Sequence, residues 1–162
     1  REFIGYSYDG ADASFELLAR RLMGDIPRYI SINEYDVSVK KDSLGDIISY
    51  AKAQLEVDGE KILCEGEGNG PVHALDNAIR KNVNKLAKYS DYLKDLKLVD
   101  YKVRILNTGT EAVTRVSIES TDSKGKNWFT IGVSPNIIEA SFKALVDSLD
   151  YKLFKDNAPA SL

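Results

Sequence analysis

The sequence predicts an α+β fold in which two strand-strand-strand-helix units follow a short linker helix. Segments of alternating apolar and polar residues come in two groups, and each group leads into an amphipathic helical segment. Each unit alone would bury too little apolar surface, so we expect pairing of the two units or of two chains. A shift of about 66 residues brings three pairs of small residues into the same local context: Gly66 and Gly132, Ala74 and Ala140, Ala78 and Ala144.

Five elements are expected in the first half of the chain. Phe15, Leu18 and Leu22, with the neighbouring Leu17, lie at helical spacing and predict a short lead-in helix. Asp58 and Gly59 are typical of a tight hairpin between two alternating segments. The expected elements are a helix over residues 11–24, a strand over 30–39 with an irregular start at Asn33 and Glu34, strands over 47–57 and 61–65, and a helix over 71–88.

The second half repeats this order after a linker rich in Lys, Asp and Tyr. Turns are expected at Thr108-Gly109 and Lys124-Gly125. The expected elements are strands over 101–105, 115–119 and 128–133 and a helix from Pro135 or Asn136 to Leu153. We therefore divide the chain into a linker helix (residues 1–27), a paired-unit domain (28–155) and a frayed tail (156–162).

Composition limits the classes of function. The 162 residues, 43% hydrophobic and 29% charged, are enough for one well-buried domain. A net charge of -3 gives no electrostatic reason to expect nucleic acid or an anionic membrane, and no apolar run approaches the roughly 20 residues that span a bilayer. The single cysteine, Cys64, lies in an apolar strand, which predicts a buried, inert thiol in a reducing cytoplasm. Because the chain opens at Arg1 without a signal-peptide pattern, we interpret it as a piece of a longer polypeptide.

The stretch GEGNGPVHALDNAIRK, residues 66–81, is the strongest local signal. Gly66, Gly68 and Gly70 allow backbone angles that other residues avoid, and Pro71 suits the first turn of a helix. The expected result is a helix start with free backbone N–H groups, which attracts a carboxylate or a phosphate. The spacing fits neither the dinucleotide-binding nor the P-loop pattern, so a purely structural turn remains the alternative.

Catalytic chemistry is hard to locate in this sequence. The single histidine, His73, has no second histidine or cysteine cluster with which to hold a metal, and we interpret it as an exposed or capping residue. No nucleophile elbow is present. Trp128 is interpreted as a core or interface residue, and Tyr101 is singled out because it opens a strand beside the linker.

Four ordered blocks of the sequence resemble the C-terminal allosteric domain of the 2-isopropylmalate synthase and citramalate synthase family, over about residues 35–153. The blocks are GEGNGPVHALDNAIRK, DYKVRIL, VSIEST and WFTIGVSPNIIEASFKALVDSLDYKL. The lead-in YDGADASFELLARRL resembles the segment that joins this domain to the catalytic barrel in the citramalate synthase branch, and DYKVRIL also favours that branch.

The resemblance implies a sensor domain without chemistry of its own. Family members condense acetyl-CoA with a 2-oxo acid in a metal-dependent barrel, and a separate C-terminal domain forms a homodimer and binds the end-product amino acid. The fold implied is the LeuA allosteric and dimerisation type, which matches the repeat described above. No cofactor is expected in this chain, and a divalent metal and acetyl-CoA are expected in the catalytic region of the parent enzyme.

The resemblance also implies which residues contact the effector. The glycine turn and helix start would hold its carboxylate, and apolar side chains would wall its aliphatic side chain. His73 departs from the small or acidic residue common at this position, which leaves the partner of the amino group open. The implied residues are Gly68, Asn69, Gly70, Val72, His73, Leu98, Tyr101, Ile105, Thr110, Thr114, Pro135 and Ile137.

Several functions stay open at this point. Isoleucine is the expected effector if the parent is a citramalate synthase, and leucine is the alternative, because apolar pockets resolve such a difference by only about 1–3 kcal/mol. A constitutive dimerisation module without an effector predicts the same fold. A double-stranded RNA-binding module is disfavoured by the acidic composition, and an isolated enzyme is the least favoured reading.

Overall fold

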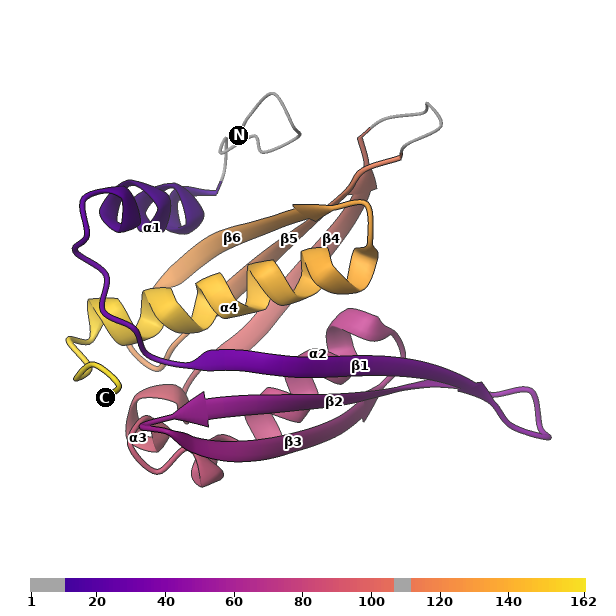
Figure 1. Ribbon diagram of the computed structural model, residues 1–162. Helices are drawn as coiled ribbons and strands as arrows, with labels where there is room; N and C mark the ends of the chain where they lie inside the picture. The colour runs from indigo at the N-terminus through magenta and orange to yellow at the C-terminus, as the bar shows by residue number, and fades with distance from the viewer. Residues whose placement is uncertain (1–10, 107–111) are drawn as a thin grey trace. The chain divides into compact units, whose positions relative to one another are not determined.

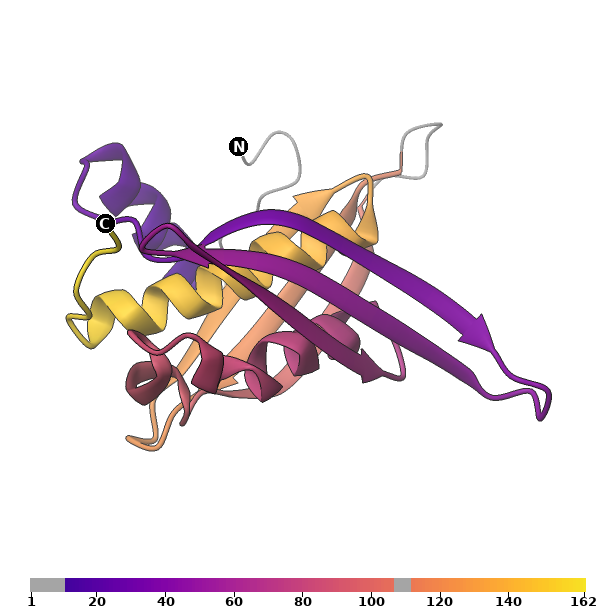
Figure 2. The same cartoon turned by 60° about the horizontal axis from the view of Figure 1, so that its bottom comes forward.

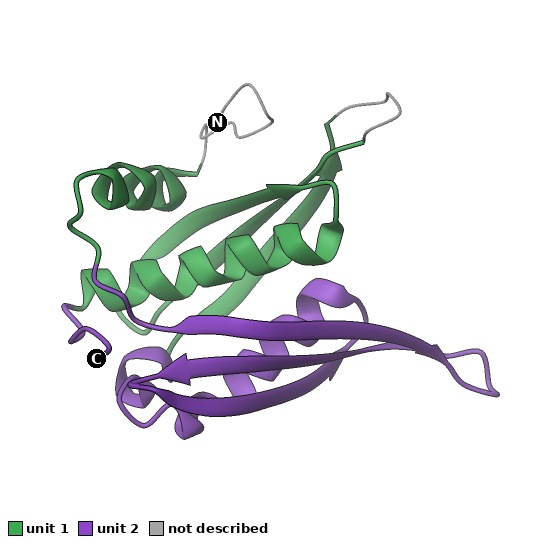
Figure 3. Ribbon diagram, viewed as in Figure 1, with its two compact units in different colours: residues 1–26, 95–156 green, residues 27–94, 157–162 purple. Residues whose placement is uncertain are grey.

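The chain forms two compact units in the computed structural model, which describes residues 11–106 and 112–162. Unit 1 comprises residues 1–26 and 95–156, and unit 2 comprises residues 27–94 and 157–162 (Figure 3). Each unit has one three-stranded antiparallel sheet with a helix across one face (Figure 1, Figure 2). The predicted α+β fold of two repeated βββα units is therefore confirmed.

Unit 2 contains the first repeat. Its sheet has the order β1-β2-β3, and α2 packs against β3 and β2 and scarcely reaches β1. The predicted hairpin joins β2 to β3 through Asp58 and Gly59, both in the left-handed region at φ 53° and 78°. The elements are β1 (Ser31–Lys41), β2 (Ile47–Val57), β3 (Glu60–Gly68), α2 (Pro71–Lys81), the short 3₁₀ helix η2 (Val83–Lys85) and α3 (Ser90–Leu93).

The helix expected over residues 71–88 was predicted too long, because α2 ends at Lys81. The next residue, Asn82, is buried, and its side-chain amide donates hydrogen bonds to the carbonyl oxygens of Ala78 and Glu65. An asparagine that bonds the backbone in this way competes with continuation of the helix. The apolar pattern was nevertheless right beyond this point, since Val83 and Leu86 are both buried.

The glycines of the predicted turn have a different role from the one expected. Gly66, Gly68 and Gly70 all lie outside the left-handed region. Gly66 and Gly68 belong to β3, where the helix lies so close that a Cβ on Gly66 would come within 2.3 Å of the backbone N of Ala78. The absence of a side chain, and not an unusual backbone angle, is what this sheet requires.

Unit 1 contains the second repeat and the N-terminal helix. Its sheet has the order β4-β5-β6, and α4 packs against β6 and β5. The close approach recurs here, since a Cβ on Gly132 would lie 1.9 Å from the carbonyl oxygen of Ala140. The small residues that revealed the repeat are therefore the points where helix and sheet meet. The elements are α1 (Asp12–Leu22), β4 (Lys97–Ile105), β5 (Thr114–Thr121), β6 (Asn127–Ser134) and α4 (Ile137–Lys155).

Helix α1 packs against α4 and β6 and so belongs to unit 1. The predicted apolar face was right at Leu17, which is buried, and wrong at Phe15 and Leu22, which are 57% and 81% exposed. The other buried residues are Ala13 and Ser14. The Ser14 hydroxyl accepts a hydrogen bond from the backbone N–H of Ile131 on the edge strand β6, at 2.9 Å. Ser14 thus satisfies one backbone N–H at this edge of the sheet. Apolar periodicity alone does not predict such a contact.

Residues 157–162, for which fraying is expected from the sequence, make hydrogen bonds to the rest of unit 2. The backbone N–H of Ser161 donates to the carbonyl oxygen of Arg28 at 2.7 Å. The Tyr89 hydroxyl donates to the carbonyl oxygen of Pro159 at 2.9 Å, and the Leu162 N–H donates to the Asp58 carboxylate at 2.7 Å. The bond from the Leu162 N–H, together with the Lys88 ammonium and the Ser161 hydroxyl, lowers the pKa of Asp58.

Candidate functional site

The start of α2 is open. Gly70 precedes the helix in an extended conformation at φ −159° and ψ 174°, and no side chain caps the first turn. Pro71 occupies the first helical position, and the first turn carries no acidic residue. The first backbone N–H groups of a helix have no partner within it, so those of Val72 and His73 remain as donors here. This is the anion-attracting arrangement that the sequence predicts.

The equivalent start of α4 in unit 1 is closed. The side-chain oxygen of Asn136 accepts hydrogen bonds from the backbone N–H groups of Ile138 and Glu139, at 2.8 and 3.2 Å. Ser134 in turn accepts a hydrogen bond from the Asn136 N–H and donates one to the Glu139 carboxylate. The Ser134 bond and Lys143 lower the pKa of Glu139, so a negative charge already occupies this turn. Of these two helices, α4 therefore has a side-chain cap at its start and α2 has none.

His73 neither caps the helix nor points freely into solvent. It is half-buried, and its ring packs over Gly68, where a Cβ would come within 2.9 Å of the ring's Cγ. One turn further along α2, Asp76 is buried and forms an ion pair with Arg80. Burial raises the pKa of Asp76, although Arg80 and His73 act in the opposite direction. The expectation of an exposed or capping histidine is thus replaced by one packed on the sheet.

A wall of apolar side chains lies on β4 in unit 1. Tyr101 pairs with Ile118 and Val103 with Val116, and both β5 partners are fully buried under α4. Residues paired across an antiparallel ladder share one face, so Tyr101 and Val103 continue the apolar face beyond the helix. Their side chains are 40% and 41% exposed.

A bulge in β4 places Leu98 on the same face. The register shifts between Leu98 and Asp100, so that Leu98 pairs with Ser120 while Tyr101 pairs with Ile118. Without this shift the two residues would point to opposite faces, because side chains alternate along a strand. The wall consists of Leu98, Tyr101, Val103 and Ile105.

The structure brings some of the predicted effector residues together and separates others. Ile105 pairs with Thr114, and Thr114 pairs with Ser134, so these residues lie at the end of the sheet where α4 begins. Pro135 and Ile137 are exposed at this same end. Leu98 lies toward the other end of β4, roughly 20 Å from Ile105 at the usual rise of a strand, so one small amino acid cannot contact both. Gly68, Asn69, Gly70, Val72 and His73 belong to unit 2, and Thr110 lies outside the described residues.

Unit 2 carries a counterpart of this wall that was not predicted. The strand β1 has a bulge between Ile32 and Glu34, and Tyr35 and Val37 pair with buried Ala53 and Ala51. The shift of about 66 residues that relates the glycines also relates the two walls. Applying this shift to the first wall would have predicted the second one from the sequence. The second wall consists of Ile32, Tyr35, Val37 and Val39.

Residues 11–106 and 112–162 contain no group of three or more His, Cys, Asp or Glu side chains that could hold a metal ion. No helix in this part of the chain is long and apolar enough to cross a membrane. Cys64 is fully buried as predicted, and burial raises the pKa of its thiol.

Residues 9–153 match the family described as the LeuA allosteric (dimerisation) domain. The chain is 48% identical over 157 residues to an (R)-citramalate synthase of Aquifex aeolicus, covering 94% of this chain and 29% of the relative. It is 45% identical to an (R)-citramalate synthase of Geobacter sulfurreducens, over 93% of this chain and 28% of the relative. Similarity to a 2-isopropylmalate synthase of Burkholderia multivorans is lower, with 33% identity over 67% of this chain and 19% of the relative. The chain thus spans less than a third of the length of these relatives.

Proposed function

Because the chain belongs to the LeuA allosteric (dimerisation) domain family, we propose that it is the feedback-regulatory domain of a citramalate synthase and that its effector is isoleucine. The observation that carries this proposal is the similarity to (R)-citramalate synthases over almost the whole chain, at 48% and 45% identity. The match to a 2-isopropylmalate synthase covers only 67% of the chain at 33% identity. Leucine is therefore the second candidate effector.

The open start of α2 supports binding of an amino-acid carboxylate. The free N–H groups of Val72 and His73 and the positive end of the helix dipole would hold the carboxylate, as at other anion-binding helix starts. Within unit 1, the apolar side chains of β4 are the surface on which an aliphatic effector side chain would pack. Since Leu98 and Ile105 are too far apart for one small ligand, we assign this contact to the Ile105 end of β4, with Thr114, Pro135 and Ile137.

The parent enzyme and the assembly are part of the same proposal. Two copies would form a homodimer through this domain, joined to their own catalytic barrels in a cytoplasmic acyltransferase. Acetyl-CoA and a divalent metal would act in the barrel, and this chain would have no turnover of its own. Effector binding would shift an equilibrium between active and inhibited arrangements of the parent enzyme.

The test is calorimetric titration of the chain with isoleucine, leucine and valine, beside a Gly70→Asn variant. Gly70 has an extended backbone and open space at its Cβ position, so asparagine fits there and can cap α2 as Asn136 caps α4. We expect the variant to keep its stability within a few tenths of a kcal/mol and to bind isoleucine at least about tenfold more weakly.

Each other outcome decides against part of the proposal. Preference for leucine would assign the parent to 2-isopropylmalate synthesis. If none of the three amino acids binds, the remaining function is that of a constitutive dimerisation module. Unchanged affinity in Gly70→Asn would show that the start of α2 does not hold the carboxylate, and comparison of Leu98→Ala with Ile105→Ala would show which end of the wall contacts the ligand.

A further inference from the structure

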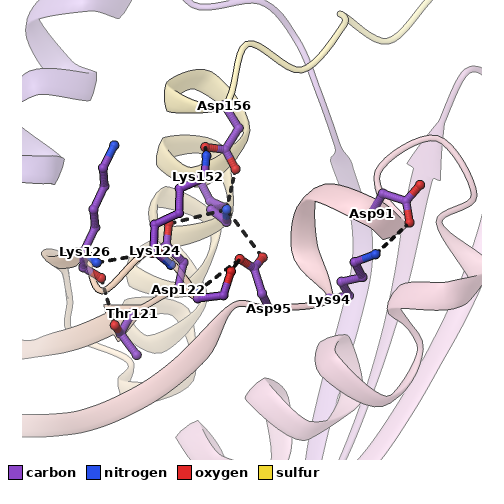
Figure 4. Close-up of polar contacts among 10 residues, drawn as sticks. Asp91, Lys94, Asp95, Thr121, Asp122, Lys124, Lys126, Lys152 and Asp156 are labelled. Carbon is purple, nitrogen blue, oxygen red and sulfur yellow. Dashed lines mark hydrogen bonds and ion pairs between the residues drawn. The ribbon is translucent and has the colours of Figure 1, made fainter.

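The far end of α4 contains a buried lysine surrounded by carboxylates. The ammonium of Lys152 lies 3.4 Å from the carboxylate of Asp95 and 3.5 Å from that of Asp122, and it also pairs with Asp156 (Figure 4). The Lys152 side chain is only 3% exposed. Asp122 also accepts hydrogen bonds from the backbone N–H groups of Lys124 and Lys126. Each carboxylate oxygen of Asp95, Asp122 and Asp156 therefore has at least one partner within the protein.

A cleft of about 340 Å³ opens beside this cluster, entirely within unit 1. Its volume falls in the range of small-molecule sites, about 300–1,000 Å³. The rings of Trp128 and Tyr151 form one part of its lining, with centroids 5.7 Å apart and planes tilted by 38°. The remaining lining residues are Asp122, Lys126, Asn127, Lys152, Lys155 and Asp156.

Two donors in this lining have no acceptor in the described part of the chain. The indole Nε1–H of Trp128 is buried without a hydrogen-bond partner, and the Trp128 side chain as a whole is 5% exposed. The exposed ammonium of Lys126 makes no ion pair with a described residue, whereas Lys155 is paired with Glu16 at 2.7 Å. A buried donor without a partner is uncommon in folded proteins and needs a reason.

We propose that this cleft is a second ligand site, for a small organic anion that carries a carboxylate or a phosphate on a planar apolar body. The unpaired groups are donors, while the acceptors Asp122 and Asp156 are occupied, so the complementary ligand is an acceptor. The anionic group meets the Lys126 ammonium, and the planar body lies against the two aromatic rings. The Trp128 N–H is buried, so it donates to the ligand only once the side chains that line the cleft move apart.

This site is separate from the proposed effector site. The cleft adjoins the last residues of α4, whereas Pro135 and Ile137 stand at its first turn. A helix of 19 residues is about 28 Å long. The two proposals therefore fail independently: saturating isoleucine should not displace a ligand from the cleft, and Gly70→Asn should weaken isoleucine binding alone.

Trp128 is the single tryptophan of the chain, so its fluorescence reports on this cleft directly. The experiment titrates the whole chain with phenyl phosphate and benzoate as probes, with benzyl alcohol and inorganic phosphate as matched controls that lack the charge or the ring. We expect a saturable fluorescence change with at least one of the two probes and a much weaker response to either control. A response to one probe alone identifies the anionic group.

Two variants test the contacts. Lys126→Gln should weaken probe binding about tenfold, while Lys61→Gln, at an exposed lysine of unit 2, should leave it unchanged. Trp128→Phe keeps an aromatic ring in the lining of the cleft and removes the N–H, so calorimetry should show weaker binding of the probe. The proposal is overturned by the absence of a saturable response to both probes, by equal binding of benzyl alcohol, or by Lys126→Gln and Trp128→Phe variants that bind like the parent chain.

Discussion

Replacing Gly66 with alanine tests the close approach of α2 to its sheet. The added Cβ would lie 2.3 Å from the backbone N of Ala78, 2.6 Å from the Cα of Ala78 and 2.8 Å from the carbonyl carbon of Asn77. Ordinary contact begins at 3.4 Å, and backbone atoms cannot rotate away as a side chain can. The helix therefore has to move off the sheet by roughly 1 Å, against an interior packed like a crystal.

The cost follows from the contacts that this movement weakens. A gap of up to about 1 Å forfeits a quarter to a half of the dispersion energy at each contact, and overpacking a core costs about 1–3 kcal/mol. Because the Cβ would clash with backbone atoms, we expect Gly66→Ala to lower the free energy of unfolding by about 3 kcal/mol, the upper end of this range. For a chain of this length that corresponds to a fall of about 6–12 °C in Tm, measured by circular dichroism.

A double variant distinguishes this explanation from side-chain crowding. Ala78→Gly removes the Ala78 methyl group and leaves the clashing N and Cα in place, so it should not rescue Gly66→Ala, and the double variant should be no more stable than Gly66→Ala alone. Ser38→Ala on the exposed face of β1 is the neutral control. Rescue by Ala78→Gly, or a Gly66→Ala variant as stable as the control, would refute the backbone-contact argument.

Two further predictions concern unit 1. Ser14→Ala removes the acceptor for the buried N–H of Ile131 and the donor to Asp147. The free energy of unfolding, measured in denaturant, should therefore fall by about 2 kcal/mol. A fall below about 0.5 kcal/mol would mean that α1 does not protect the edge of β6. Burial raises the pKa of Asp150 to about 7, against the attraction of Arg21, so the folded chain binds an extra proton between about pH 4 and 7. Its contribution to stability is complete below about pH 4 and is lost as the pH rises through 7, by at most about 1.4 kcal/mol per pH unit. Asp150→Asn should flatten this part of the pH–stability curve, and an unchanged slope would contradict the assignment.

Alternation of apolar residues located the six strands, but it predicted β3 and β4 too short, since they run over Glu60–Gly68 and Lys97–Ile105 and the predictions were 61–65 and 101–105. Ala51, Ala53 and Leu55 of β2 are buried as expected, and the Asp58-Gly59 hairpin has the predicted left-handed geometry. The end of α2 was not predictable in this way, because Asn82 ends the helix through bonds that depend on the neighbouring strand. Local patterns report what a residue prefers, and tertiary contacts decide among the preferences.

The candidate site was predictable in part. The glycine and proline residues before α2 correctly predicted an open helix start, since both signals are local. The bulge that turns Leu98 toward Tyr101 was not predictable from alternation, because a bulge is a departure from alternation. A comparison of the two repeats would also have predicted which helix start lacks a cap. Gly70 in the first repeat occupies the position of Asn136 in the second, and only the asparagine has a side chain that can cap the helix.

Lys152 also pairs with residues at two of the places where the chain passes from one unit to the other. The chain passes between them after Ile26, after Lys94 and after Asp156. Asp95, the first residue of unit 1 after the second passage, and Asp156, the last before the third, are both held by the Lys152 ammonium. Two of the three covalent connections between the units therefore begin at a residue that is paired with the same buried lysine of α4.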